Sequence, residues 1–118
     1  MKKKKQKTLS RLKREADATF SKWILKRDKY ICFTCGRPAN QNAHYVSRTW
    51  LGLRYSEVNC NASCFRCNIV LRGNMDEYAR ALIAKYGDGI LNMLAKMKKP
   101  TQMKRKDYEE IIAKYEKS

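Results

Sequence analysis

The chain has 118 residues, of which 27 are Lys or Arg and 11 are Asp or Glu, giving a net charge of +16. This length predicts one domain with a modest core that a metal ion or a partner chain would help to stabilise. The charge favours a polyanionic partner. No segment reaches the roughly 20 apolar residues of a membrane span, and the lysine-rich start lacks the apolar stretch of a secretory signal.

The amino-terminal quarter is the most basic part of the chain. Residues 1–27 carry 11 basic and 2 acidic side chains, a net charge of +9. The lysine run predicts a disordered tail over residues 1–7, followed by a single domain over 8–118. Residues 8–27 predict an amphipathic helix, because apolar side chains recur at helical spacing: Leu9, Leu12, Ala16, Phe20, Trp23 and Ile24.

The rest of the chain divides into an irregular core and a helical end. Residues 28–74 lose the helical periodicity and contain all five cysteines, which predicts short strands and loops. Residues 75–118 regain it in three stripes, Met75–Tyr86, Ile90–Met97 and Tyr108–Tyr115. The fold class expected is therefore α+β, with helices flanking a small core.

Two C-x2-C pairs, separated by 28 residues, carry the strongest chemical signal in the core: Cys32 with Cys35, and Cys64 with Cys67. Four thiolates in this pattern predict a closed tetrahedral zinc site. Ordinary buried cysteines or a redox pair are the weaker interpretations. A closed site leaves no position for a substrate, so this zinc would be structural. We expect Cys60 to be a small buried apolar residue.

The lone histidine, His44, and the two asparagines Asn59 and Asn68 are threaded through these pairs. This order resembles an HNH-type nuclease whose third position is Asn. The segments HYVSR, LRYSEVN, CFRCN, RGNMDEY and LIAKYG resemble the phage NinG (Rap) recombination endonuclease family. The resemblance runs from near Phe20 to KDYEEIIAKY, most of the chain except the lysine tail.

The resemblance implies a zinc-stapled ββα-metal core. A strand would carry His44, a hairpin would return with Asn59, and a helix beginning near Cys64 would carry Asn68. In this scheme Asn59 supports the loop that orients His44, and Asn68 faces a catalytic ion. Asn61 is expected on the surface.

The chemistry implied is phosphodiester hydrolysis. A neutral imidazole can accept the proton of the attacking water, and Mg²⁺ or Mn²⁺ suits oxygen ligands. Phosphate contacts are expected from Arg48, Arg54, Arg66 and Arg72. Many HNH nucleases place a metal ligand directly before the histidine, where this chain has Ala43. The second ligand is therefore open among Asn42, Gln41, Asp76 and a backbone carbonyl.

The function implied is a metal-dependent DNA endonuclease that cuts branched recombination intermediates such as Holliday junctions or D-loops. It would act in the cytoplasm of a bacterial host, and symmetry favours a homodimer built on the carboxy-terminal helices. The alternatives are a general HNH nicking or restriction-type enzyme, and a zinc-stapled nucleic-acid-binding module without catalysis. Trp50 is expected either to pack on the hairpin or to contact an unstacked base.

Overall fold

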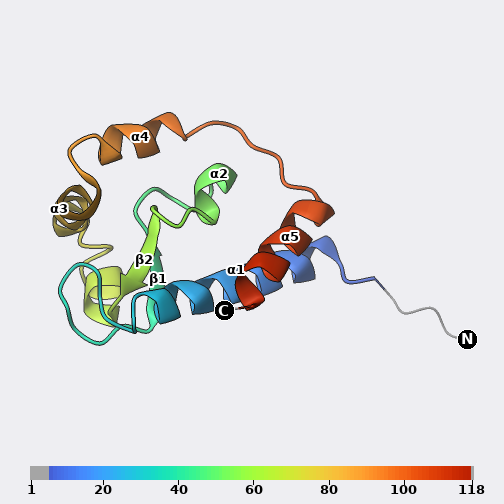
Figure 1. Cartoon of the computed structure of the whole chain (residues 1–118), viewed down its shortest axis with the longest axis horizontal. Coiled ribbons are helices and arrows are strands. Elements are labelled where there is room, and N and C mark those ends of the chain that lie inside the picture. Colours follow the sequence, from blue (N-terminus) through green and yellow to red (C-terminus); the bar gives the residue numbers. More distant parts are fainter. Residues whose placement is uncertain (1–5, 118) are drawn as a thin grey trace, which may run out of the picture.

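The predicted amino-terminal helix is present in the structure, a computed structural model that describes residues 6–117. Helix α1 (Leu9–Arg27) begins at Thr8, whose Oγ1 accepts a hydrogen bond from Arg11 N at 3.2 Å. Leu12, Ala16, Phe20 and Ile24 form its buried face, at the predicted i, i+4 spacing. At 19 residues, it is the longest element of the fold (Figure 1).

The predicted tail differs at its inner end. Residues 1–5 lie outside the described residues. Lys7, however, places its Nζ 2.9 Å from Glu15 Oε2, and its carbonyl accepts a hydrogen bond from Arg105 Nη1 at 2.6 Å. Lys7 therefore contacts both α1 and the carboxy-terminal helix that begins at Arg105.

The core contains a two-stranded antiparallel sheet and a helix that follows it. Strand β1 (Gln41–His44) pairs with β2 (Cys60–Ser63), with His44 opposite Cys60. The connection contains the short helix α2 (Leu51–Arg54), which the sequence did not predict. After β2 the chain enters η1 (Arg66–Val70), a π-helical turn in which an N–H donates to the carbonyl five residues earlier, as Leu71 N does to Arg66. The short strands and loops expected for residues 28–74 are therefore present, together with two short helical segments.

Helices α3 (Met75–Tyr86) and α4 (Ile90–Lys96) pack near the sheet on the side away from α1 (Figure 1). Their buried side chains form one cluster with residues of β1 and α2: Ala43, Val46, Leu53, Tyr78, Leu82, Ile90 and Leu94. Trp50 packs against this cluster, which is the first of its two predicted roles. Met75 and Tyr86, the predicted ends of the α3 stripe, are instead 41% and 37% exposed.

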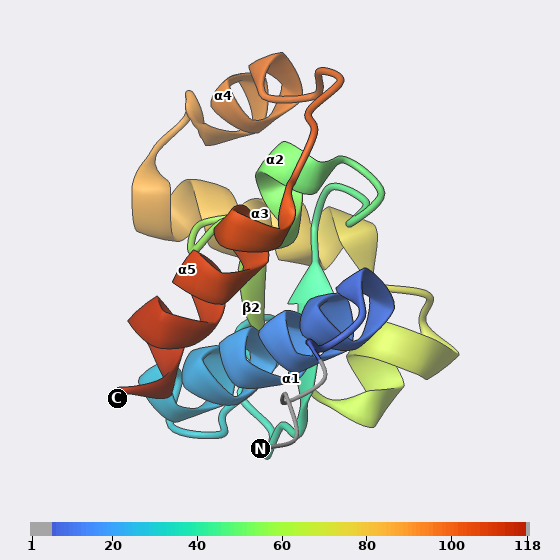
Figure 2. The same ribbon diagram turned by 90° about the vertical axis from the view of Figure 1, so that its right-hand side faces the viewer.

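Helix α5 (Arg105–Glu116) returns along α1, as both ribbon views show (Figures 1 and 2). Tyr108 packs with Leu12 and Ala16, and Tyr115 packs with Phe20 and Ile24. The apolar face that suggested a homodimer is thus covered within the chain. A homodimer stays a prediction, without this surface to support it.

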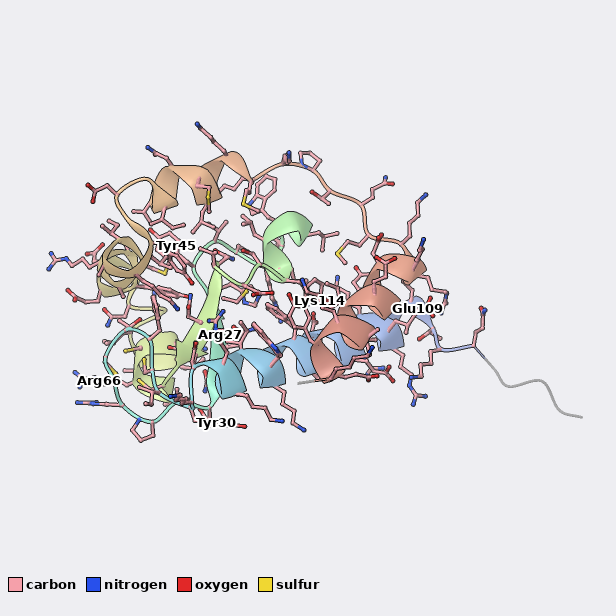
Figure 3. All side chains as sticks on the ribbon, viewed as in Figure 1. Arg27, Tyr30, Tyr45, Arg66, Glu109 and Lys114 are labelled. Atoms are coloured by element: carbon pink, nitrogen blue, oxygen red, sulfur yellow. The ribbon has the colours of Figure 1, made fainter. Side chains whose placement is uncertain are left out.

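The prediction that Asn61 is a surface residue is wrong, because its side chain is fully buried. Its Oδ1 accepts a hydrogen bond from Arg27 Nη2 at 3.0 Å, and its Nδ2 donates to Tyr78 Oη at 3.0 Å. The Tyr78 hydroxyl then donates to the Ala43 carbonyl at 2.7 Å. These bonds connect the end of α1, both strands and α3, with Arg27 lying between α1 and the sheet (Figure 3).

The described residues therefore form a compact α+β unit of helices around a small sheet. Within residues 6–117, no helix is both long enough and apolar enough to cross a membrane.

Candidate active site

The four cysteines of the two C-x2-C pairs come together, as their spacing predicted. Their sulfur atoms all lie within 4.8 Å of one another, and Cys35 Sγ is 3.6 Å from Cys64 Sγ. A zinc ion with Zn–S bonds of about 2.3 Å holds its sulfurs about 3.8 Å apart. The cluster therefore suits a structural metal such as zinc.

Cys32 and Cys35 lie on a tight turn whose backbone hydrogen bonds bring the two sulfur atoms to the same side. Cys32 N donates to the Arg37 carbonyl at 2.7 Å, and Gly36 N donates to the Cys32 carbonyl at 2.9 Å. Gly36 has φ +79°, a conformation that favours glycine. The second pair begins at the end of β2 and continues into η1, so a bound metal would fix η1 against the loop that carries Cys32.

The pKa values of the thiols differ around the cluster. Burial opposes ionisation of Cys32, but backbone N–H groups of Cys35, Cys64 and Thr34 outweigh it and lower its pKa to about 6. Burial raises the pKa of Cys67 to about 12, and neighbouring sulfurs add to this. A divalent ion offsets such costs because it binds thiolates directly.

A cavity of about 330 Å³ lies between α1, β1 and η1. Its lining contains both polar residues that the sequence analysis singled out and residues that it missed. These are Asp17, Phe20, Ser21, Asn42, His44, Arg48, Arg54, Tyr55 and Asn68. His44 and Asn68, which are 24 positions apart in the sequence, thus face one space.

His44 ends β1 and is held by the short helix α2. Its Nε2 lies 2.9 Å from the Arg54 carbonyl oxygen. Since a carbonyl only accepts, Nε2 carries the proton and Nδ1 has a free lone pair. Burial lowers the pKa of His44; the carbonyl contact opposes this, while the charges of Arg54 and Arg48 add to the lowering. The imidazole is therefore neutral at neutral pH and able to accept a proton at Nδ1.

Asn59 supports the chain on both sides of α2. Its Oδ1 accepts a hydrogen bond from Val46 N at 2.8 Å, and its Nδ2 donates to the carbonyls of Val46 and Leu53 at 3.0 and 3.1 Å. The side chain is fully buried. Asn59 thus fixes the segment that follows His44 and the residue before Arg54, and it does not line the cavity.

Asn68 lies in the π-helical turn between Cys67 and the exposed residues that follow. Its Nδ2 donates to Gln41 Oε1 at 2.6 Å, so Oδ1 is the atom left to bind a cation. π-Helical turns occur often at functional sites, where the wider turn reorients a side chain. Cys67 directly precedes Asn68 in the same turn, so a metal held by the cysteine cluster would help to fix that orientation.

The residue before His44 faces away from the cavity. Strand side chains alternate between faces, and Ala43 is buried in the core with Tyr78 and Leu82. The neighbour on the same face as His44 is Asn42, which lines the cavity. Asn42 Nδ2 donates to Ser21 Oγ at 3.2 Å.

Asn42 Oδ1 is, among residues 6–117, the one buried side-chain nitrogen or oxygen without a hydrogen-bond partner. A buried, unpaired acceptor costs about 1–3 kcal/mol, so a cation in the cavity would offset that cost. Amide oxygens from Asn42 and Asn68 fit Mg²⁺ or Mn²⁺, which prefer oxygen ligands. Of the other candidates, Gln41 and Asp76 are not among the residues that line the cavity.

Arg54 departs from its predicted role as a phosphate contact. Its guanidinium is buried and binds Asp17 through both Nε and Nη2, with Nε 2.8 Å from Oδ1. Tyr55 Oη also donates to Asp17 Oδ1, at 2.7 Å. Burial opposes ionisation of Asp17, but the hydrogen bonds from Arg54 and Tyr55 outweigh it and lower its pKa. Arg54 is therefore a structural residue, and its ion pair with Asp17 fixes the backbone carbonyl to which His44 Nε2 is hydrogen-bonded.

Asp17 was missed by the sequence analysis, although a signal was present. It lies on helix α1, directly after the buried Ala16 and three residues before the buried Phe20. A carboxylate at the edge of an apolar stripe must find a buried cation. Arg48, Arg66 and Arg72 are exposed, and of these Arg48 lines the cavity.

These features define a small, basic α+β protein with a cysteine cluster suited to a structural metal, beside a polar cavity. The family model described as "Bacteriophage Lambda NinG protein" matches residues 1–118. The chain therefore belongs to the NinG family, which implies a bacteriophage protein related to recombination. Searches of curated proteins and of solved structures found no match.

Proposed function

We propose that this protein is a metal-dependent DNA endonuclease of the HNH type, in the form with Asn at the third position, that cuts branched DNA during phage recombination. The observation that carries the proposal is the meeting of three groups in one basic cavity. These are a neutral histidine, an asparagine on the following helix, and the unpaired oxygen of Asn42. The strand–strand–helix order that holds them supports the same conclusion.

His44 acts as the general base in this proposal. With Nε2–H held by the Arg54 carbonyl, Nδ1 accepts the proton of the attacking water. Asp17 does not touch the histidine; it fixes Arg54 and Tyr55, and through them the carbonyl that orients the ring. A general base must be positioned before its pKa matters, and the Asp17–Arg54 pair provides that positioning.

Asn42 and Asn68 would hold the divalent ion, each through its Oδ1. When bound, Mg²⁺ or Mn²⁺ neutralises charge on the phosphoryl oxygens and assists departure of the leaving oxygen. Asn42 would serve as the second ion ligand in place of the residue directly before His44, because that residue, Ala43, faces the core. Arg48, exposed at the rim, supplies a bidentate donor for a flanking phosphate.

The experiment that tests the proposal compares a labelled four-way junction with a linear duplex of the same sequence. Zinc-loaded protein is incubated with added Mg²⁺, added Mn²⁺ or neither. We expect cutting of the junction that requires the added ion and exceeds cutting of the duplex. Equal cutting of both substrates would instead identify a general HNH nuclease. Salt-sensitive binding without cutting under every condition would identify a non-catalytic zinc-stapled module.

Asn42 offers a test of the ion site that does not depend on activity. Asn42→Asp adds a charge to the proposed ligand set, so we expect Mn²⁺ to bind about tenfold more tightly, while Asn42→Ala weakens binding. Mn²⁺ titration followed by electron paramagnetic resonance measures both changes in zinc-loaded protein. Asn40→Asp is the matched control, because Asn40 is exposed outside the cavity. Equal effects of the Asp substitutions at positions 40 and 42 would contradict this assignment.

The lowered pKa of His44 predicts the acid limb of the pH–rate profile. A base works in its neutral form, so lowering its pKa extends activity to lower pH. We expect the cutting rate to stay level down to a pH below 6.5, the ordinary histidine pKa, and then to fall. Arg48→Ala removes one of the positive charges that lower this pKa and should move the limb to higher pH. The measurement is single-turnover cutting across pH, and a limb above the ordinary histidine value in the wild type would contradict the account.

A further inference from the structure

One short segment holds half of the large apolar side chains that are exposed among the described residues. Between positions 65 and 75 these are Phe65 at 58%, Ile69 at 52%, Val70 at 61%, Leu71 at 42% and Met75 at 41% exposed. We call these five residues the apolar ridge. Clustered exposed apolar side chains mark interaction sites more often than isolated ones do.

The apolar ridge is held away from the core by fixed contacts on both sides. Its helix begins at the cysteine cluster, and Leu71 N donates to the Arg66 carbonyl at 2.8 Å. The following turn is tied back to Cys67, whose carbonyl accepts from Gly73 N at 2.9 Å and whose Sγ lies 3.6 Å from Asn74 Nδ2. These contacts fix the backbone of the turn in a conformation that leaves the five side chains exposed.

The ridge borders the proposed active site. Asn68, which lines the cavity, lies in the sequence between Phe65 and Ile69. The yellow-green turn that carries these residues projects beside α1 and β1 (Figure 2). A strand whose phosphate enters the cavity would therefore lie next to the segment that carries the ridge.

The charges around the ridge favour a nucleic acid over a second copy of the chain. Arg66 and Arg72 are exposed within it, and Arg66 extends from the outer edge of the molecule (Figure 3). Residues 64–75 contain no Asp or Glu. Another copy would bring the same positive segment and a net charge of +16, whereas DNA brings phosphates for the arginines and apolar base faces for the ridge.

We propose that the apolar ridge packs against unstacked bases at a DNA branch point and thereby selects branched over continuous duplex DNA. This inference rests on the proposed function, since it places the branch at the cavity. Apolar side chains wedge between or stack on bases where stacking is interrupted, and a continuous duplex offers no such faces. The arginines bind the phosphates on either side.

The test uses full-length, zinc-loaded protein and a four-way junction with 2-aminopurine at the branch point, without added Mg²⁺ or Mn²⁺. The variant is Ile69→Ser with Val70→Ser, and the matched control is Met93→Ser, on α4 and 46% exposed. We expect wild type and Met93→Ser to change the 2-aminopurine fluorescence on binding. The double variant should lose that change and bind the junction about tenfold more weakly, with duplex binding unchanged.

Two results would overturn the inference. Unchanged junction affinity and fluorescence in the double variant would remove the ridge from DNA recognition. A dimer in sedimentation that the double variant converts to a monomer, with the fluorescence change intact, would assign the ridge to self-association. The assay measures binding and not cutting. A protein that gives the expected binding and fluorescence results but cuts no DNA would therefore contradict the proposed function and leave this inference standing. Melting temperature and zinc content check that each variant folds.

Discussion

Replacing His44 by Ala is expected to reduce the rate of metal-dependent cutting by a factor on the order of 10²–10⁴, the usual contribution of a general base. His44 is the only histidine in the chain. Within residues 6–117, the one hydrogen bond of its side chain goes to the Arg54 carbonyl, so removal of the imidazole should leave the fold intact. Single-turnover cutting of a labelled junction measures the effect, with junction affinity and melting temperature measured on the same samples.

Ser47→Ala is the matched control for this variant, because Ser47 is exposed three residues after His44 and does not line the cavity. It should cut at the wild-type rate. If His44→Ala cut as fast as the wild type, the base would lie elsewhere and the proposed mechanism would be wrong. A parallel loss of junction binding would show instead that the histidine holds the DNA.

If the cysteine cluster binds a structural zinc, as its geometry suggests, removal of that ion should have the largest effect on stability. The cluster joins the loop of Cys32 to the start of η1, and the apolar groups packed around it are small: Ala39 and Ala62, with Leu25 at the edge. Structural zinc contributes about 10–16 kcal/mol in small domains, whereas whole domains are stable by about 5–15 kcal/mol. We therefore expect zinc chelation, or Cys64→Ser, to abolish the cooperative melting transition of this core.

Cys60 provides the control for the zinc prediction. It is a fifth buried cysteine, but its sulfur lies near the carbonyls of Leu53 and Arg54 and outside the cluster. Cys60→Ala should keep one zinc per chain by mass spectrometry and keep a cooperative transition. A chelated wild-type protein that melts at the same temperature as the zinc form would show that the cluster does not stabilise the fold.

The features readable from sequence were those with a local pattern. Helix α1 follows from the i, i+4 recurrence of Leu12, Ala16, Phe20 and Ile24, and the cysteine cluster follows from two short spacings. The burial of Cys60 was also predicted. Each of these depends on residues near one another in the chain, or on a ligand set that a metal brings together.

The features that escaped prediction depend on distant partners. Asn61 was expected at the surface because nothing near it in the sequence reveals Arg27 or Tyr78, 34 and 17 positions away. Arg54 was expected to contact DNA because its partner Asp17 lies 37 positions earlier. Helix α2, with four residues, is too short to show a period.

The uncertainty about the second ion ligand came from the same limit. The sequence showed Ala43 where a ligand was expected, but the pairing of β1 with β2 decides which residues share a face with His44. Strand alternation places Ala43 in the core and Asn42 in the cavity. Strand β1 is only four residues long, and its bounds had to be known before the alternation could show which side chains face the cavity.

The most direct test of the central claim is a crystal structure of His44→Ala with a four-way junction and Mn²⁺, using the anomalous signal to locate the ion. The account predicts a manganese peak in the cavity, within bonding distance of Oδ1 of Asn42 and of Asn68, with a junction phosphate oxygen on the same ion. The bases at the branch should lie against the apolar ridge. A junction bound on another face, with no manganese between those two asparagines, would contradict the assignment of this cavity as the site of cutting.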